Sequence, residues 1–341
     1  MIFIVLMLIL FILYLLFVEL YPVKRIKVKP SEGSLQSIPD LYVYAFQIHL
    51  HSQFSYDSLG KPEDIIRKAE QENIDYVIVT DHDTDAIKNF AGDRLIAGVE
   101  KKVLGEGGAI LGDLLEVEDL KVVAHPFKKR YRWKLELPKE YLFELIDLKD
   151  AILERKTLLL FLLPSLVLKA FFSKKLALQS LKKMLKPERY AKLYLRMNIE
   201  NQVVGGLDHH VKVYVREVGV RFLFPDYSDS FRLLRNFLLT STKVVNKEEF
   251  PRALKKGMTV ISFEEKPTIY WKEEGFLKIL PPYKCLLLQV GKESEAWYKG
   301  SFFQIKPEKG ISFFIGYTYS FELVGLYFGL KPIFVIRWKE A

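Results

Sequence analysis

The chain has 341 residues, a formal net charge of +9, and a composition that is 50% apolar and 14% aromatic. Its length suits about two or three domains, and its apolar content argues against disorder. The single cysteine, Cys285, excludes a disulfide framework within the chain and a thiolate zinc site, so any metal would depend on His, Asp and Glu. The positive charge favours anionic partners, whether phosphate substrates, acidic lipid or nucleic acid.

The N-terminal segment carries no charge over residues 1–18 and predicts a membrane anchor. As a helix it would extend about 27 Å, close to the thickness of a bilayer core. It lacks the basic start and small-residue cleavage site of a signal peptide, so we expect a retained transmembrane helix over 1–21 and a linker over 22–40. A basic flank follows at Lys24, Arg25, Lys27 and Lys29. The positive-inside bias therefore favours a cytoplasmic body, and an extracytoplasmic body stays open.

From residue 41 the chain alternates apolar runs with amphipathic stretches. Strands are expected over 41–50, 74–80, 95–99 and 122–124, and a helix over 62–73. This alternation is typical of a parallel α/β architecture. We assign it to residues 41–258.

Residues 157–172 form a second apolar stretch, inside a helical insertion expected over 151–197. Between Lys169 and Arg196, nine Lys or Arg residues stand against one acid. One interpretation is a buried helix followed by a solvated basic helix. The other is an interfacial element over 157–196 that lies on anionic lipid. The sequence leaves both open.

Short strand-like runs separated by Gly, Pro and charged turns begin near Pro267. They predict a small β-sandwich-like domain over 259–341. Its strands are expected at 268–271, 285–290, 302–305, 311–317, 321–328 and 333–338.

Histidines and carboxylates gather where the predicted strands end. His49 and His51 are two residues apart and so can point the same way from a strand end, with Asp57 following in a loop. The stretches TDHD, GVE, AHP and GLDHH supply His82, Glu100, His125, Asp208 and His210. The C-terminal ends of strands carry the active site in barrel and other α/β enzymes, so we expect these side chains to converge. Together they suit two or more Mn, Zn or Fe ions about 3.5–4 Å apart.

In this order HLHSQFSYDS, TDHD, GVE, AHP and GLDHH resemble the motifs of the polymerase and histidinol phosphatase (PHP) superfamily, over about residues 44–255. The resemblance implies a distorted (β/α)7 barrel with two or three divalent metal ions, and hydrolysis of phosphate esters by many members. The spacing of the first motif, the helical stretch before GLDHH and the PDYSDSFRLLRNFLL that follows it are similar to the branch that includes the carbaryl hydrolases.

The resemblance carries metal-ligand roles onto eight positions of this chain. They are His49, His51, Asp57, His82, Glu100, His125, Asp208 and His210. By this resemblance Glu100 matches a carboxylate that bridges two metal ions. Asp81 is expected to contact the ligands without binding a metal itself, and His209 fills a variable position of the last motif. Many members have another ligand histidine between 126 and 208, and this chain has none there. Two metal ions are therefore expected, with a third left open.

The leading hypothesis is hydrolysis of a small phosphate ester by a hydroxide that bridges two metals. Asp57, His210 and Asp81 are the expected catalytic residues, and Asp57 or His210 would protonate the leaving oxygen. Lys128 and Arg130 would bind phosphate, unless their run is only a solvated loop.

Two other functions remain open. The same chemistry on a carboxyl ester, carbamate or amide is the second hypothesis, and a non-catalytic, membrane-bound binding protein with a degenerate barrel is the third. No nucleic-acid module is evident, so no specific nucleic-acid partner is expected.

Overall fold

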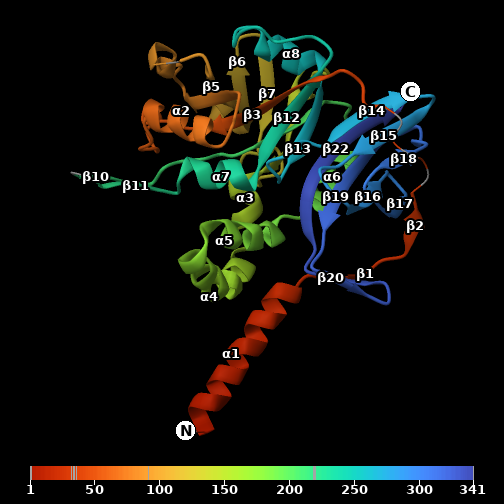
Figure 1. The fold of residues 1–341 in the computed structure, drawn as a ribbon. Helices are drawn as coiled ribbons and strands as arrows, with labels where there is room; N and C mark the ends of the chain where they lie inside the picture. Colours follow the sequence, from red (N-terminus) through yellow and green to blue (C-terminus); the bar gives the residue numbers. More distant parts are fainter. Residues whose placement is uncertain are drawn as a thin grey trace.

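The structure is a computed structural model that describes residues 2–31, 33, 35, 37–90, 92–217 and 220–340. A body of sheets and helices carries one long helix, α1 (Ile2–Leu20), which projects from one end of it (Figure 1). Within the described ranges, α1 is the one helix that is long and apolar enough to cross a membrane, a test that a signal sequence also passes. It coincides with the anchor predicted over 1–21.

The first part of the body is a curved sheet whose strands are neighbours in chain order. These strands are β3 (Tyr42–Leu50), β4 (Tyr76–His82), β5 (Leu95–Leu104), β6 (Ile110–Val117), β7 (Leu120–Ala124), β8 (Leu142–Asp147) and β9 (Val203–Gly206). Neighbours are parallel from β3 to β5 and from β7 to β9, whereas β6 is antiparallel to β5 and β7. The predicted parallel arrangement is found in these two runs and is interrupted at β6, because short connections replace the crossover helices there.

The two ends of this run of strands meet. Leu50, at the end of β3, forms a parallel bridge with His209, just after β9. The side chain of Asn236, in β12 (Arg235–Thr240), bonds both the N–H and the C=O of Gly205 in β9. Because β12 also pairs with β3, the sheet curves back on itself and brings the ends of distant strands together. The number of barrel strands stays a prediction.

Both faces of the sheet are covered. In β4, Tyr76 and Ile78 belong to one apolar cluster, while Val77 and Val79 belong to a larger one on the other face. Alternate side chains point to opposite faces, so the run YVIV is apolar throughout. The remaining helices of this part are α2 (Pro62–Gln71), α3 (Leu148–Leu153), α7 (Tyr227–Leu233) and α8 (Phe250–Lys256).

The C-terminal region is mostly β, as expected. Its strands are β14 (Ile269–Glu273), β15 (Phe276–Leu280), β16 (Cys285–Val290), β17 (Glu295–Gly300), β18 (Phe303–Ile305), β19 (Gly310–Thr318), β20 (Phe321–Leu323), β21 (Leu326–Phe328) and β22 (Lys331–Glu340). β13 (Met258–Ser262) pairs with β12 on one side and β22 on the other, so backbone hydrogen bonds cross the boundary predicted at 258. The division into domains stays a prediction.

Two short strands lie in the stretch predicted as a linker, and one hairpin follows β9. β1 (Val23–Arg25) pairs with β21, and β2 (Val28–Pro30) pairs with β17. β10 (Val213–Glu217) and β11 (Val220–Phe224) form the hairpin. Residues 22–30 thus add to the β-rich region instead of connecting freely to it.

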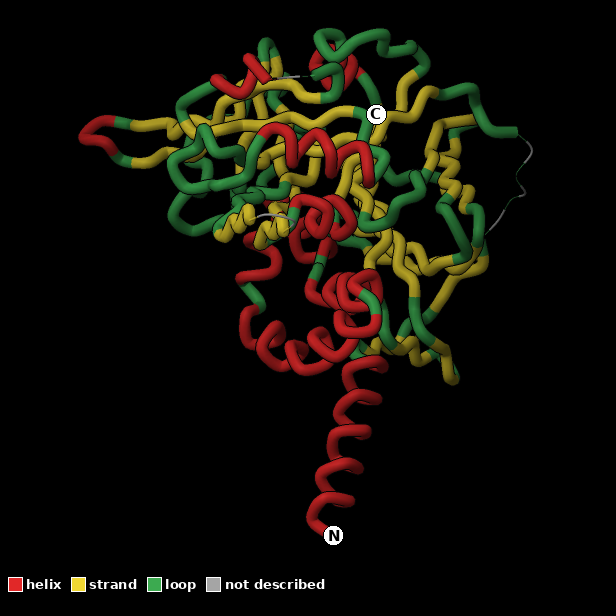
Figure 2. Tube along the Cα trace, turned by 60° about the vertical axis from the view of Figure 1, so that its left-hand side comes forward, coloured by secondary structure: helices red, strands yellow, loops and turns green. Residues whose placement is uncertain are grey.

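The second apolar stretch forms α4 (Lys156–Phe172), which is followed by α5 (Lys174–Leu181) and α6 (Pro187–Arg196). In both overall views α4 and α5 lie at the end of the body from which α1 projects (Figures 1 and 2). Only Leu162 and Ser165 of α4 are buried. The interpretation of this stretch as a buried helix is therefore wrong.

Candidate metal centre

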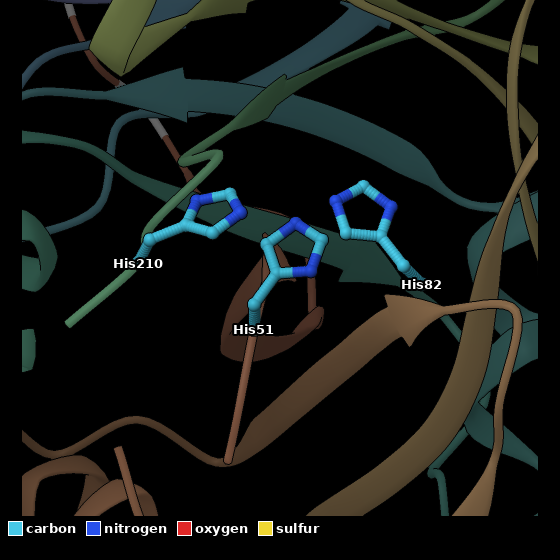
Figure 3. Close-up of side chains that lie close together, drawn as sticks. All are labelled: His51, His82 and His210. Atoms are coloured by element: carbon cyan, nitrogen blue, oxygen red, sulfur yellow. The ribbon is translucent and has the colours of Figure 1, made fainter. Parts of the chain in front are cut away.

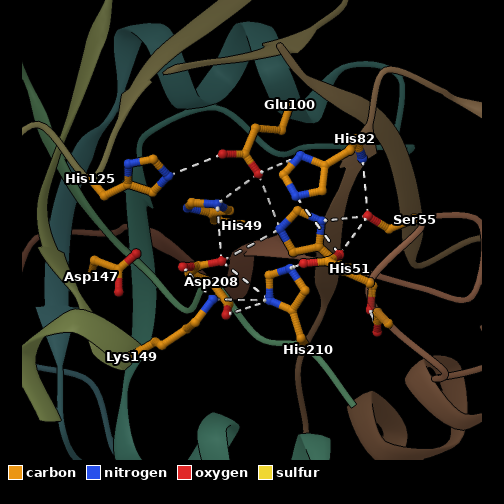
Figure 4. Close-up of polar contacts among 12 residues, drawn as sticks. His49, His51, Ser55, His82, Glu100, His125, Asp147, Lys149, Asp208 and His210 are labelled. Carbon is orange, nitrogen blue, oxygen red and sulfur yellow. Dashed lines mark hydrogen bonds and ion pairs between the residues drawn. The ribbon is translucent and has the colours of Figure 1, made fainter. Parts of the chain in front are cut away.

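The side chains predicted from the strand ends meet in one cluster (Figure 4). Three of them have left-handed backbones, with φ of 62° at His49, 28° at His125 and 43° at Asp208. Such φ values cost energy outside glycine and concentrate at functional sites. At His49 the pairing of β3 with β4 shifts register, so the His-x-His pair departs from simple strand alternation. Its two imidazoles nonetheless both point into the cluster.

Glu100, in β5, lies at the centre of the cluster and is only 3% exposed. Its Oε2 lies 3.3 Å from His49 Nε2, 3.2 Å from His51 Nε2 and 3.5 Å from His82 Nδ1. Its Oε1 lies 3.1 Å from His125 Nε2. The two oxygens therefore face different imidazoles, which is the arrangement of a carboxylate that bridges two metal ions.

Three imidazoles lie together (Figure 3) near the more exposed side of the cluster, marked by His82 and Asp57, which we call its mouth. His51, His82 and His210 can each offer a ring nitrogen within 4.8 Å of the others. Asp57 Oδ2 lies 2.9 Å from His210 Nε2, and Asp208 Oδ1 lies 3.3 Å from His210 Nδ1. Asp57, which is 30% exposed, is the most solvent-accessible of the eight predicted ligands.

The donor set fits divalent cations on two observations. Two ligands about 2.1 Å from one ion, at right or tetrahedral angles, lie roughly 3.0–3.4 Å apart, close to the separations around Glu100. Several buried ring nitrogens and carboxylate oxygens also lack a hydrogen bond of good geometry, even where a charged neighbour is close, and cations held by the cluster would relieve this deficit. Among the described residues these atoms include His51 Nε2, His125 Nδ1, His210 Nε2 and Asp113 Oδ1. Imidazole with carboxylate, and without thiolate, suits Zn, Mn or Fe.

Three buried carboxylates in the cluster were missed by the sequence reasoning: Asp113 in β6, and Glu144 and Asp147 in β8. Glu144 Oε1 lies 2.8 Å from His49 Nδ1, and its other oxygen accepts a hydrogen bond from the His125 N–H. Asp113 Oδ2 lies 3.6 Å from His125 Nε2. An acidic side chain in a strand that is buried along its whole length needs a charged or polar partner. The sequence of β8, LFELID, contains two such acids, and this feature could have indicated their place in the site.

Two lysines stand at the same end of the cluster as Asp208. Lys149 Nζ, on α3, lies 2.8 Å from Asp208 Oδ2. Lys128 Nζ lies 3.0 Å from Asp150 and 3.6 Å from Asp208. Of the two basic residues expected to bind phosphate, Lys128 is therefore beside the ligands. Arg130 is exposed and lies over the ring of Tyr131, with no hydrogen bond or ion pair to the cluster in the described part of the chain.

Asp81 and His209 lie outside the ligand cluster and have structural partners. Both Asp81 oxygens accept hydrogen bonds from Ser52, one from its N–H and one from its hydroxyl, each at 2.6 Å. Asp81 thus fixes the loop that carries His51. His209 Nδ1 lies 2.7 Å from Ser230 Oγ, and its ring packs on Tyr227.

Burial and neighbouring charge perturb the ionisable groups of the cluster. Burial lowers the pKa of His51 to about 3. Burial also disfavours charge on His49, but the carboxylates of Glu144 and Glu100 raise the pKa of that imidazole well above its usual range. Burial raises the pKa of Asp113 to about 6. A metal ion would have to displace the extra proton of His49 and, below about pH 6, the proton of Asp113, whereas His51 is already neutral.

Comparison with known proteins finds a match for one part of the chain. No curated protein matches the chain. A crystal structure of a two-domain protein from Bacteroides vulgatus, described as containing a predicted PHP-like metal-dependent phosphoesterase, aligns over 92% of this chain and 98% of its own with a TM-score of 0.38 and 11% identity. The family model described as the PHP domain matches residues 47–145, which hold every residue of the cluster from His49 to Glu144 and leave out Asp208 and His210.

Proposed function

We propose that this chain is a metal-dependent hydrolase of phosphate esters. The observation that carries the proposal is Glu100, whose two oxygens lie 3.1–3.5 Å from nitrogens of four histidines. A buried carboxylate among so many imidazoles has no evident structural purpose, and it is costly to bury without cations. The PHP domain match over 47–145 points to the same chemistry.

In this proposal His49, His51 and Glu100 would hold one divalent ion, and Glu100, Asp113 and His125 would hold a second. His82 and His210 complete the first site toward the mouth, and Asp208 lies between His51 and His210. When bound, such ions lower the pKa of a water toward neutrality and stabilise charge on a phosphoryl oxygen. Glu144 and Asp147 offer carboxylates for a third ion beside His49.

Other side chains would bind the substrate and move its proton. Lys128 and Lys149 place two ammonium groups beside Asp208, and this positive charge favours an anionic ester over a neutral one. Asp57 and His210 lie 2.9 Å apart at the mouth, where either could protonate the leaving oxygen. Asp81 would act indirectly, through the loop that carries His51.

The test combines metal content with a substrate screen on the full chain in detergent. We expect two or more Mn, Zn or Fe ions per chain by mass spectrometry, fewer in the His49→Ala/His51→Ala double variant, and turnover of phosphate esters that this variant lacks. Turnover of carboxyl esters or carbamates alone would replace the phosphate assignment. A metal-free protein, even after growth with added Mn or Zn, would favour a binding protein with a degenerate barrel.

A further inference from the structure

The solvent-facing side of α4 is apolar from Leu160 to Phe171. Leu160, Leu163, Val167 and Phe171 are 67%, 47%, 62% and 87% exposed. Their spacing of three and four residues places them on one face of the helix. Phe172, beside this face, is 76% exposed. A soluble protein seldom leaves a contiguous patch of large side chains bare, so this face has an unidentified partner.

The opposite face of α4 is joined to α1. The Tyr14 hydroxyl donates a hydrogen bond to the Phe161 carbonyl at 2.7 Å, and the two rings meet edge to face. Lys169 Nζ pairs with Glu19 at 2.7 Å. These contacts hold the exposed face of α4 in a fixed relation to α1, the one described helix that is apolar enough to cross a membrane.

α1 is also built into the body at its C-terminal end. The ammonium group of Lys183, almost wholly buried, donates to the carbonyls of Val18 and Glu19 at 2.8 Å each. These are carbonyls that the last turn of a helix leaves unpaired. Cleavage after a signal sequence would leave this buried lysine without those partners, so the contacts favour a retained helix.

The contacts also set a depth. Tyr14 precedes Leu20, the end of α1, by six residues, or about 9 Å along a helix. Helices that lie in a membrane interface bury their apolar face about 5–10 Å into the boundary between headgroups and acyl chains. If α1 spans the bilayer up to its C-terminal end, α4 is therefore held at interfacial depth.

Crossing by α4 itself is incompatible with the sheet. β8 precedes the insertion and β9 follows it, and the two strands are paired neighbours. Both ends of the insertion thus return to the same side of any bilayer.

The basic residues of the insertion contribute less surface charge than their number implies. Lys174 pairs with Asp229, Lys175 with Glu265, Lys182 with Glu264, Arg189 with Glu154 and Lys192 with Glu295. Such pairs leave little net charge for anionic lipid. Contact with the membrane would then depend mainly on the apolar face of α4.

We propose that the exposed face of α4 lies in the surface of a lipid bilayer, beside the point where α1 leaves it, and that burial of Leu160, Leu163, Val167 and Phe171 in lipid holds the body there. The proposal concerns the surface alone and is independent of the catalytic assignment. In this proposal the body contacts the membrane by inserting apolar side chains of α4 into the lipid, and not by attraction of basic side chains to anionic headgroups.

Depth-dependent fluorescence quenching tests the proposal on the full chain, reconstituted in vesicles of equal parts phosphatidylcholine and phosphatidylglycerol. A fluorophore is attached to single cysteines in the variants Val167→Cys and Phe171→Cys, with Ile9→Cys in α1 as the deep reference. The native Cys285 is fully buried and burial raises its pKa to about 12, so it stays unlabelled in the folded protein. The matched control is Val245→Cys, since Val245 is 75% exposed and precedes α8, at the end of the body far from α1 (Figure 1).

We expect nitroxides at a shallow acyl position to quench the probes at 167 and 171 several-fold more than the probe at 245, and nitroxides at a deep position to quench the probe at 9 most. Removal of the phosphatidylglycerol should leave the quenching at 167 and 171 within about twofold. Quenching at 167 and 171 equal to that at 245 would overturn the proposal, as would deeper quenching there than at 9. Loss of the quenching in pure phosphatidylcholine would overturn apolar insertion in favour of electrostatic attachment.

Discussion

Replacement of Glu100 by Gln is the sharpest perturbation of the proposed metal centre. Glutamine keeps the size of the side chain and removes the charge that both proposed ions share. Loss of a residue that only supports a ligand weakens metal binding about 10–100-fold, so loss of a shared ligand should cost at least the upper figure. That corresponds to about 2.8 kcal/mol for each ion, since a tenfold change is about 1.4 kcal/mol.

The assay is equilibrium dialysis against Mn or Zn with metals counted by mass spectrometry. Glu116→Gln is the matched control, because Glu116 lies on the neighbouring strand and, among the residues that the structure describes, forms ion pairs only with the surface groups of Lys101 and Lys121. A surface pair of this kind contributes about 0–1 kcal/mol, so the control should bind metal as the parent does. Equal affinities in Glu100→Gln and Glu116→Gln would refute the bridging role of Glu100.

Three further changes probe other parts of the centre. A Cβ at Gly206 would lie 1.3 Å from Glu144 Oε1, so Gly206→Ala should displace that carboxylate, lower the metal content and destabilise the fold by about 1–3 kcal/mol in denaturant titration. The pKa of Asp113 is raised to about 6 from an ordinary 3.8, so below pH 6 a metal ion must displace a proton from this carboxyl group. Metal affinity should therefore fall as pH falls. Asp113→Asn should release about one proton fewer per chain on metal binding below pH 6, as measured by calorimetry. Lys149→Met should raise KM for phosphate esters about 10–100-fold through loss of a charged hydrogen bond, and Arg130→Met, on an exposed side chain, should leave it unchanged.

The raised pKa of Asp113 also affects the stability of the metal-free protein, which should change with pH in the opposite direction to the metal affinity. Between about pH 4 and pH 6 the native, metal-free protein holds a proton on Asp113 that the unfolded chain has lost. Stability falls with rising pH wherever the native state binds more protons. Metal-free protein should therefore lose stability from this group across that range, and Asp113→Asn should flatten the change.

Much of the cluster could be predicted because its residues stand where apolar runs stop. His82 ends β4, His125 directly follows β7 and His51 follows β3. Strand ends at one edge of a sheet converge, so sequence position alone implied spatial proximity. The sequence did not predict three acids that lie inside or at the ends of buried strands, namely Asp113, Glu144 and Asp147. An acid there interrupts the apolar run by which a buried strand is recognised, so the strand and its acid are both overlooked. Lys149 was missed because the approach of α3 to Asp208 depends on the closure of the sheet.

The strand directions show a different limit. Apolar runs predicted the positions of β3, β4, β5 and β7, but periodicity does not distinguish a parallel neighbour from an antiparallel one. β6 was not expected at all, and it reverses the pairing between β5 and β7. In the C-terminal region most strands were found from their turns, whereas the continuity of β13 with β22 depends on contacts that are distant in sequence.

The insertion and the metal centre constrain each other. Asp147 closes β8 and also caps α3, accepting a hydrogen bond from the Asp150 N–H at 2.7 Å, and α3 leads directly into α4. After α6 the chain re-enters the sheet as β9, whose end carries Asp208. A helix that crossed the bilayer between these strands would place Asp147 and Asp208 on opposite sides, yet their carboxylates share one group of potential metal ligands. An apolar stretch of this length can therefore reach lipid only along the surface, as the pairing of β8 with β9 already requires.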